Sequence, residues 1–227
     1  MFDRLDKLIG EEARKEIEGK KVLLIGVGGV GGFALEALVR SGFNNITIVD
    51  YDTIDESNLN RQIITNEKNL GKIKVEEALL RAKSIRSNIC INPLNIKLTD
   101  ANLVELLDNN YDYIIDACDD LEIKFLLIKY SMKYNYKLIS SMGTAKKTKP
   151  ELLSITTLDK TFNDPIARIL RSRVKKEHIN TKVHVVSSTE TIKEVKEKGT
   201  CILVPSVAGI LCASYIFNDI ISSSSNN

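Results

Sequence analysis

Residues 21–61 decide the fold, and they read KVLLIGVGGVGGFALEALVRSGFNNITIVDYDTIDESNLNR. An apolar run ends at Ile25, glycines follow from Gly26 onward, and a helical pattern covers residues 30–40. A second apolar run then ends on Asp50. This order of strand, glycine turn, helix and strand predicts a βαβ unit that binds a nucleotide.

The glycines have the spacing of a phosphate-binding turn. Gly26, Gly28 and Gly31 fit the pattern GxGxxG, and Gly29 stands among them. The first permits a tight turn, the second lets the backbone approach a phosphate, and the third lets helix and strand pack closely. Asp50, about 20 residues further on, is placed to accept hydrogen bonds from ribose hydroxyls. A tight turn without a ligand is the alternative.

The remaining sequence continues the alternation of strands and helices. Strands are predicted at 89–98, 113–117 and 137–141, and helices at 74–87, 101–107 and 121–134. After residue 142 the rhythm changes, and the segments there are strands at 152–157 and 182–187 and helices at 164–178 and 204–221. We predict an α/β, Rossmann-like, doubly wound and mainly parallel sheet, with helices on both faces and a C-terminal strand and helix extension.

The chain has no linker and no internal repeat that would divide it. Residues 3–18 form a short amphipathic helical lead-in that is interrupted at Gly10. Residues 1–221 are therefore predicted to be a single domain, and the serine-rich end, residues 222–227, a disordered tail.

Composition favours a reduced, cytoplasmic protein. The net charge of +2 gives no global argument for nucleic acid, and the four cysteines form no CxxC pair. The N-terminus has no apolar signal region. The apolar segment 204–221 contains Pro205, Asn218 and Asp219, so it predicts a core or subunit-interface helix and no membrane span. The two histidines, His178 and His184, lack the partners of a zinc site.

A long segment, residues 51–73, has neither helical nor strand periodicity. Connections of this length in a compact α/β protein are usually functional. Asn58, Arg61 and Lys74 follow the switch from sheet to helix, where open α/β sheets bind ligands. Cations directed at a triphosphate would stabilise the pyrophosphate that leaves it. Solvated surface charges are the alternative for Arg61 and Lys74.

A second acidic cluster ends the strand predicted at 113–117. It contains Asp116, Asp119 and Asp120. Carboxylates at this edge could hold Mg²⁺, which binds through one or two carboxylates together with substrate phosphates. The alternative is that they form the N-cap of the next helix.

At these residues the chain resembles the ubiquitin-activating-enzyme-like superfamily, which includes the ThiF, MoeB and HesA proteins. The matching segments are GVGGVGG, IVDYD, SNLNRQ, GKIK and DACDD. The later segment LISSMGTAKKTKPELLSITTLDKTFNDPIARILR is similar to the tRNA threonylcarbamoyladenosine dehydratases within that superfamily. The resemblance covers nearly the whole chain and implies a ThiF-type ATP-binding domain that adenylylates a carboxylate with ATP and Mg²⁺.

The resemblance also implies roles for individual residues. Phosphates would lie on Gly28 and Gly29, and Asp50 would bind the ribose. Asn58 and Arg61 would contact ATP, Lys74 would meet the phosphates, and Asp119 would be the Mg²⁺ ligand. An N-terminal arginine, best matched by Arg4, would reach the ATP of a partner subunit, which implies a homodimer.

The activity implied by the resemblance is ATP-dependent dehydration of N6-threonylcarbamoyladenosine in tRNA through an acyl adenylate. A cyclisation of this kind needs no separate nucleophile, because the attacking atom already lies close to the activated carbon. Two alternatives remain: an adenylyltransferase for the C-terminal carboxylate of a small carrier protein, and a non-catalytic nucleotide-binding scaffold. A nicotinamide-dependent dehydrogenase would leave SNLNRQ and the long loop unexplained.

A tRNA substrate requires basic surface, and two clusters are candidates. Lys146, Lys147 and Lys149 follow the strand predicted at 137–141, and Arg168 and Arg171 belong to the basic helix predicted at 164–178. A solvated helix face is the alternative for this helix. The aromatic residues Tyr134, Tyr136 and Phe162 could stack on bases but are expected to lie in the core.

Some features depart from the sulfur-carrier activators of the superfamily. Those proteins often have paired CxxC zinc motifs, and this chain has none, which argues against a MoeB-like role. A sulfurtransferase or cysteine desulfurase is a candidate protein partner. Cys201 and Cys118 are expected to be packing residues rather than functional thiols.

Overall fold

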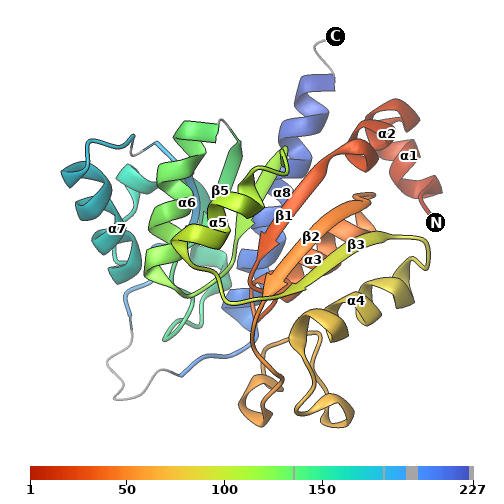
Figure 1. The fold of residues 1–227 in the computed structure, drawn as a ribbon, viewed down its shortest axis with the longest axis horizontal. Coiled ribbons are helices and arrows are strands. Elements are labelled where there is room, and N and C mark those ends of the chain that lie inside the picture. The colour runs from red at the N-terminus through yellow and green to blue at the C-terminus, as the bar shows by residue number, and fades with distance from the viewer. Residues whose placement is uncertain (135, 181, 193–198, 225–227) are drawn as a thin grey trace.

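A seven-stranded sheet organises the whole protein (Figure 1). The computed structural model describes residues 1–134, 136–180, 182–192 and 199–224. The strands run in the order β3-β2-β1-β4-β5-β7-β6. Their bounds are β1 Lys21–Ile25, β2 Asn45–Asp50, β3 Cys90–Asn95, β4 Tyr113–Asp116, β5 Lys137–Ser141, β6 Leu153–Thr157 and β7 His184–Ser188. All neighbouring pairs are parallel except β6 with β7.

Helices cover both faces of this sheet. Their bounds are α1 Asp3–Ile9, α2 Glu11–Gly19, α3 Gly31–Arg40, α4 Lys74–Ile85, α5 Asp100–Leu107, α6 Leu121–Tyr134, α7 Pro165–Lys176 and α8 Leu203–Ser224. Alternate residues of each central strand enter different cores, because successive side chains of a strand point to opposite faces. In β1, Leu24 packs in the core formed with α3, α4 and α8, whereas Leu23 packs in the core formed with α5, α6 and α7. The predicted doubly wound α/β architecture is confirmed.

The topological switch point lies between β1 and β4. From β1 the chain first adds β2 and β3 on one side and then returns to add β4 and β5 on the other. The register places Ile25 beside Asp116 at the carboxyl ends of these two strands. Open α/β sheets bind ligands in the crevice at this kind of edge.

Helix α8 packs along the sheet by one apolar face. Val204, Ala208, Cys212 and Ile216, spaced by four residues, are all buried. Gly209 allows a close approach to α3, because a Cβ atom there would lie 2.2 Å from the carbonyl oxygen of Val30. The helix is long and apolar enough to cross a membrane by length and composition alone, with mean hydropathy 1.5 over residues 203–223. Its packing agrees with the prediction of a core helix, although part of its surface is exposed.

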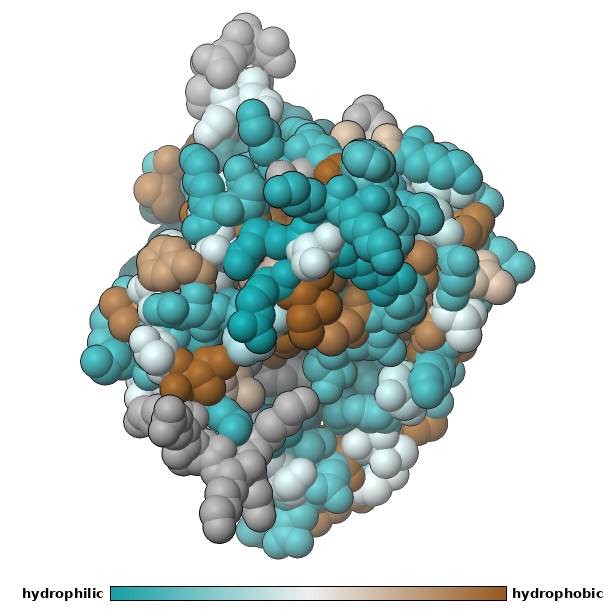
Figure 2. All heavy atoms as spheres, turned by 90° about the vertical axis from the view of Figure 1, so that its left-hand side faces the viewer, coloured by the Kyte–Doolittle hydropathy of each residue, from teal (hydrophilic) through white to brown (hydrophobic). Residues whose placement is uncertain are grey.

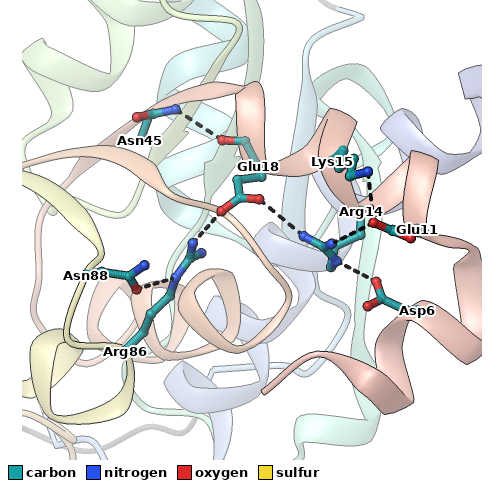
Figure 3. Close-up of polar contacts among 8 residues, drawn as sticks. All are labelled: Asp6, Glu11, Arg14, Lys15, Glu18, Asn45, Arg86 and Asn88. Carbon is teal, nitrogen blue, oxygen red and sulfur yellow. Dashed lines mark hydrogen bonds and ion pairs between the residues drawn. The ribbon is translucent and has the colours of Figure 1, made fainter.

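The N-terminal helices are held on the body of the protein by a polar network (Figure 3). Arg14 of α2 contacts Asp6 of α1 and Glu18 of its own helix. Glu18 in turn pairs with Arg86, which follows α4. The guanidinium groups of Arg14 and Arg86 lie 5.8 and 5.3 Å from the ring centre of Phe2. The predicted lead-in helix, interrupted at Gly10, is therefore two helices with a fixed position.

Two expectations about the ends of elements are corrected. The predicted tail began too early, because α8 continues through Ser224, and residues 225–227 lie outside the described residues. The long loop is also less irregular than its sequence suggested. It contains 3-10 turns at Glu56–Asn58 and Glu67–Asn69, and Thr53 forms a β-bridge with Ile73 that closes the loop on itself.

Candidate active site at the carboxyl edge of the sheet

The glycine turn after β1 leaves no room for a side chain at Gly26 or Gly31. Gly26 has φ +85°, and its N–H donates to the carbonyl oxygen of Val49 at 2.7 Å. A Cβ at Gly26 would lie 2.8 Å from the carbonyl oxygen of Ala117, beyond β4. A Cβ at Gly31 would lie 1.8 Å from the carbonyl oxygen of Gly26. The turn therefore brings backbone to the switch point, where a phosphate group can approach it.

Asp50 connects the glycine turn with the long loop. Its carboxylate accepts hydrogen bonds from the N–H of Val27 at 2.9 Å and from the N–H of Asp52 at 3.0 Å. The carboxylate thus lies at the carboxyl end of β2, directly beside the turn. This is the place that an acid must occupy to bind a ribose next to bound phosphates.

Asn58 and Arg61 lie on a short turn that is fixed by its own hydrogen bonds. The carboxylate of Asp55 accepts from the N–H of Ser57 at 2.8 Å, and the Asn58 side chain accepts from the N–H of Asp55 at 3.2 Å. The Arg61 guanidinium donates to Ser57 and, at 3.1 Å, to the side chain of Asn60. Asn58 is buried, whereas Arg61 remains partly exposed. The turn therefore presents Arg61 from a rigid base.

The turn also touches the glycines. A Cβ at Gly29 would lie 3.5 Å from the carbonyl oxygen of Arg61. Gln62, a residue without a predicted role, lies with its Nε2 atom 3.6 Å from the Cβ position of Gly28. Its Oε1 atom is buried without a hydrogen-bond partner. An unpaired buried acceptor beside the glycine turn fits a ligand that supplies the missing donor.

Lys74 begins α4 and is buried at the same edge. Its Nζ lies 2.8 Å from Oδ2 of Asp52, and its side chain is 7% exposed. Its own N–H donates to the carbonyl oxygen of Asp52 at 3.0 Å. Hydrogen bonds thus link the glycine turn, Asp50, Asp52 and Lys74 in one series. A cation held in this partly dry position interacts with phosphate more strongly than an exposed one.

The acidic cluster after β4 divides into three different environments. Asp116 is fully buried, and its carboxylate accepts from Lys124 Nζ at 3.0 Å and from Ser140 Oγ at 2.5 Å. Asp120 caps α6, since its carboxylate accepts from the N–H groups of Glu122 and Ile123. Asp119 is exposed. The predicted N-cap alternative therefore holds for Asp120, which is exposed but already accepts two backbone hydrogen bonds, whereas the exposed Asp119 carries no such role.

Lys124 is a buried partner that the sequence did not reveal. Burial alone would lower its pKa, but the Asp116 carboxylate outweighs that effect, so its pKa is raised and it stays charged. Its Nζ also donates to the carbonyl oxygen of Ser141 at 2.7 Å, at the end of β5. The pair therefore ties β4, α6 and β5 together directly beneath the turn that carries Asp119.

The carboxylates at this edge form no preformed metal site. Among the described residues, no group of three or more His, Cys, Asp or Glu side chains is close enough to hold a metal ion. Negative charge is nevertheless concentrated here. The pKa of Tyr51 is raised, first by the charge of Asp52, then by burial, and then by the charges of Asp119, Asp50 and Asp120. Mg²⁺ binds through one or two carboxylates together with phosphates, so the site fits Mg²⁺ that arrives with a nucleotide.

The comparison with known proteins decides the family. A model described as the ThiF family matches residues 2–224. The chain belongs to the ThiF family. It is 34% identical to the tRNA threonylcarbamoyladenosine dehydratase of Bacillus subtilis, over 97% of this chain and 94% of the relative. The resemblance that the motifs indicated is confirmed.

Solved structures agree with this assignment. The ThiF family chain superimposes on the Escherichia coli tRNA N6-threonylcarbamoyladenosine dehydratase, TcdA, in complex with ATP, with a TM-score of 0.94 and 28% identity. The match covers 100% of this chain and 96% of that one. The same E. coli protein has been solved with AMP. A more distant relative, the molybdopterin-synthase adenylyltransferase of Haemophilus influenzae, is 27% identical over 74% of this chain and 68% of its own length.

Three cysteines of this ThiF family protein, Cys118, Cys201 and Cys212, are at least partly buried, whereas Cys90 is exposed. Burial, the Asp116 charge and a hydrogen bond from Sγ to that carboxylate, 3.1 Å long, raise the pKa of Cys118 well above its usual value. Burial raises the pKa of Cys212 to about 12. Cys201 is partly buried just before α8. A thiol that stays protonated at neutral pH is a poor nucleophile, which agrees with the expectation for Cys118.

The basic residues predicted to contact tRNA do not share one environment. The prediction that Lys147 contacts tRNA at the surface is wrong, because its side chain is 1% exposed. Its Nζ lies 2.9 Å from Oδ2 of Asp164 and 2.7 Å from the carbonyl oxygen of Gly143. Its charge holds the loop after β5 against the start of α7. Lys149 and Arg168 are exposed, and Lys146 and Arg171 are partly exposed.

The three aromatic residues expected in the core also differ. Tyr134 and Tyr136 pack against the core formed with α5, α6 and α7, and the Tyr136 hydroxyl donates to the carbonyl oxygen of Leu127 at 2.8 Å. Phe162 is 55% exposed, so its predicted core position is wrong. The sequence could not distinguish the buried tyrosines from the exposed phenylalanine, because each of the three stands between polar neighbours.

Proposed function

We propose that this ThiF family protein is an ATP-dependent tRNA threonylcarbamoyladenosine dehydratase. The observation that best supports this proposal is the arrangement at the switch point, where the glycine turn, Asp50, Arg61 and Lys74 lie around one edge of the sheet. The likeness to the B. subtilis dehydratase along nearly the whole length of both chains supports the same substrate class.

The reaction would proceed in two steps on the substrate. The threonyl carboxylate oxygen attacks the α-phosphorus of ATP, a new P–O bond forms, and the bond to pyrophosphate breaks. A nitrogen or oxygen of the same modification then attacks the activated carbonyl carbon, loses its proton and expels AMP. The nucleoside has lost one water, and ATP has become AMP and pyrophosphate.

The chain's residues would act mainly by positioning and by charge. Gly28 and Gly29 offer backbone to the phosphates, and Asp50 accepts from the ribose. Lys74 and Arg61 bring positive charge to the pyrophosphate as it leaves. Asn58 holds the turn from which Arg61 extends, and it would also contact ATP. Mg²⁺, with Asp119 as its protein ligand, would neutralise phosphate charge when bound.

Arg4 would complete the site of a partner subunit in a homodimer. It is exposed on α1, and within the described chain it makes no hydrogen bond or ion pair. Figure 1 shows α1 and α2 at the end of the sheet opposite the loop that carries Arg61. The five residues of β1, about 16 Å long, separate these two ends. Arg4 is therefore far from its own glycine turn, which supports the proposal that it acts on the ATP of a second copy.

Binding of tRNA would use lysine and arginine side chains that are exposed or partly exposed near the edge of the sheet. Lys146, Lys149, Arg168 and Arg171 are the candidates, and Lys147 is excluded by its burial. A tRNA substrate is consistent with a cytoplasmic location. A sulfurtransferase or cysteine desulfurase partner stays a prediction of the sequence.

The experiment that tests this function measures AMP formation from ATP with purified protein and tRNA, with and without the threonylcarbamoyl modification. We expect AMP only with modified tRNA, together with a mass loss of one water on the nucleoside. AMP formation stimulated instead by a carrier protein with a free C-terminal carboxylate would identify an adenylyltransferase. ATP binding without turnover toward either substrate would identify a scaffold.

A further inference from the structure

The outer side of α7 carries a basic hollow of about 710 Å³. The residues that line it are Asp159, Arg168, Arg171, Ser172, Lys175, His178 and Ile179. Figure 2 turns the side of the molecule where α7 lies toward the viewer and shows hydrophilic side chains gathered there around smaller hydrophobic areas. Three of the lining residues are lysine or arginine and one is an acid, so the hollow favours an anion.

Cationic side chains on the two faces of α7 differ in whether they form ion pairs. On the face toward α6, Arg173 pairs with both carboxylate oxygens of Glu122, and its guanidinium lies 3.7 Å from the ring centre of Phe125. On the hollow side, Arg168 and Lys175 are exposed, and neither makes an ion pair within the described chain. The inner charge is thus used for packing, while the outer charges remain available to a ligand.

Phe162 lies beside this hollow on a fixed turn. Arg171, which lines the hollow, donates from Nη1 to the carbonyl oxygen of Thr161 at 2.7 Å and also to its hydroxyl. The next residue is Phe162, whose ring is 55% exposed. Asn163 follows with φ +56° and donates from its side chain to the carbonyl oxygen of Thr189 at 3.1 Å. The turn therefore holds an aromatic side chain at the surface, one residue from the Thr161 that binds Arg171 of the hollow.

The same turn is joined to the catalytic edge of the sheet. Asp164 caps α7, since its carboxylate accepts from the N–H of Ala167 at 3.0 Å. That carboxylate also pairs with the buried Lys147, which donates to the carbonyl oxygen of Gly143 just beyond β5. Because this pair is enclosed on all sides, α7 has a fixed position relative to the edge where the adenylate would form.

We propose that α7 and Phe162 form the surface that holds single-stranded RNA next to the reacting nucleotide. Arg168, Arg171 and Lys175 contact backbone phosphates, and Phe162 stacks on an unpaired base. This inference rests on the proposed function and assigns the substrate's docking surface. An adenosine whose N6 substituent reacts must be reached outside a stacked duplex, so its neighbours also offer free base faces. An acidic protein partner would use the charges but would have no planar bases for the ring.

The absence of tryptophan from the chain gives a direct test of stacking. In Phe162→Trp the introduced indole is the only one, so its fluorescence reports this position alone. We expect strong quenching when modified tRNA is added, and little quenching by inorganic polyphosphate that binds through charge only. Equal responses to both, or no response to a tRNA that binds, would overturn the stacking role.

Affinity measurements separate the ring from the charges. Phe162→Ala should weaken tRNA binding by about 5-fold to 100-fold, the range for loss of one stacked base. Arg168→Gln and Lys175→Gln should each reduce the slope of log affinity against log salt by about 0.7 to 0.9. Lys176→Gln, on the same helix but outside the hollow, is the matched control and should leave affinity within about twofold of the parent. Equal weakening by all four variants would contradict a docking surface on this face.

The outcomes distinguish this inference from the function on which it rests. ATP binding and the melting temperature should be unchanged in Phe162→Ala, because the ring is exposed. If the parent protein dehydrates modified tRNA and Phe162→Ala and Arg168→Gln have unchanged KM for tRNA, the docking surface is wrong and the function stands. If the parent protein neither binds tRNA nor forms AMP with it, the proposed function fails, and the docking proposal fails with it.

Discussion

Lys74 and Asp52 form an ion pair at the carboxyl edge of the sheet, with Nζ 2.8 Å from Oδ2. Asp52 also donates its N–H to Asp50, which accepts from Val27 in the glycine turn. The Lys74 ammonium is therefore positioned by a series of hydrogen bonds that also holds the glycine turn. The Lys74 side chain is 7% exposed and the Asp52 side chain 49% exposed. A phosphate that approaches from solvent can therefore be attracted by the charge of the Lys74 ammonium, which is little screened by water.

Replacing Lys74 should remove catalysis and leave the fold in place. We expect Lys74→Ala to reduce AMP formation by about 100-fold to 1000-fold, the loss seen when one preorganised charge-stabilising group is removed. Asp52 is half exposed and can be hydrated, so the loss of stability should be only about 1 kcal/mol. Lys72→Ala is the matched control, because Lys72 is an exposed lysine of the same loop that pairs with Glu77. Similar turnover in both variants would remove Lys74 from the site.

The role of Arg4 can be tested by mixing two inactive variants. Arg4→Ala lacks the arginine that a partner would receive, and Lys74→Ala lacks a functional ATP site. In mixed dimers, the intact Arg4 of the Lys74→Ala subunit would serve the intact ATP site of the other. Refolding the two together should restore about a quarter of the parent activity if subunits pair at random. No recovery, with mixed dimers demonstrated by mass spectrometry, would contradict action in trans.

The sequence predicted the elements around the switch point because local signals agreed there. The predicted helix 121–134 and strand 137–141 match α6 and β5 at both ends. Asp120 marks the start of that helix as its N-cap, and Leu138 and Ile139 followed by two small serines mark a short strand whose last four residues are buried. The glycine spacing similarly fixed the turn after β1.

The sequence could not predict pairs that form only in the folded chain. A lysine usually indicates a solvated position, whether it stands in a polar segment, as Lys147 does, or within an apolar helix, as Lys124 does. Each is buried because one carboxylate, Asp116 or Asp164, is brought to it by a different element. Gln62 was missed for a similar reason: only the folded turn places it against Gly28.

Cys118 should react only at alkaline pH. Burial and the nearby Asp116 charge raise the pKa of its thiol well above the usual value, so the reactive thiolate is scarce at neutral pH and becomes more abundant as pH rises. We expect alkylation by iodoacetamide near pH 7.5 to modify the exposed Cys90 much faster than Cys118. Peptide mass spectrometry over a pH series measures both. Rapid modification of Cys118 at neutral pH would indicate an activated thiol and reopen a covalent role.

The close approach of α8 to α3 depends on Gly209. A Cβ there would meet the carbonyl oxygen of Val30 at 2.2 Å and the backbone nitrogen of Ala34 at 2.8 Å, and backbone atoms of a packed helix cannot easily move aside. Gly209→Ala should therefore lower the free energy of unfolding by about 1–3 kcal/mol through overpacking. Gly19→Ala makes the same change at the end of α2, where nothing lies within 4 Å of the new atom, and should change stability by less than about 1 kcal/mol. Urea unfolding followed by circular dichroism compares the two variants. If both were equally stable, the contact between α8 and α3 would have to be looser than the structure shows.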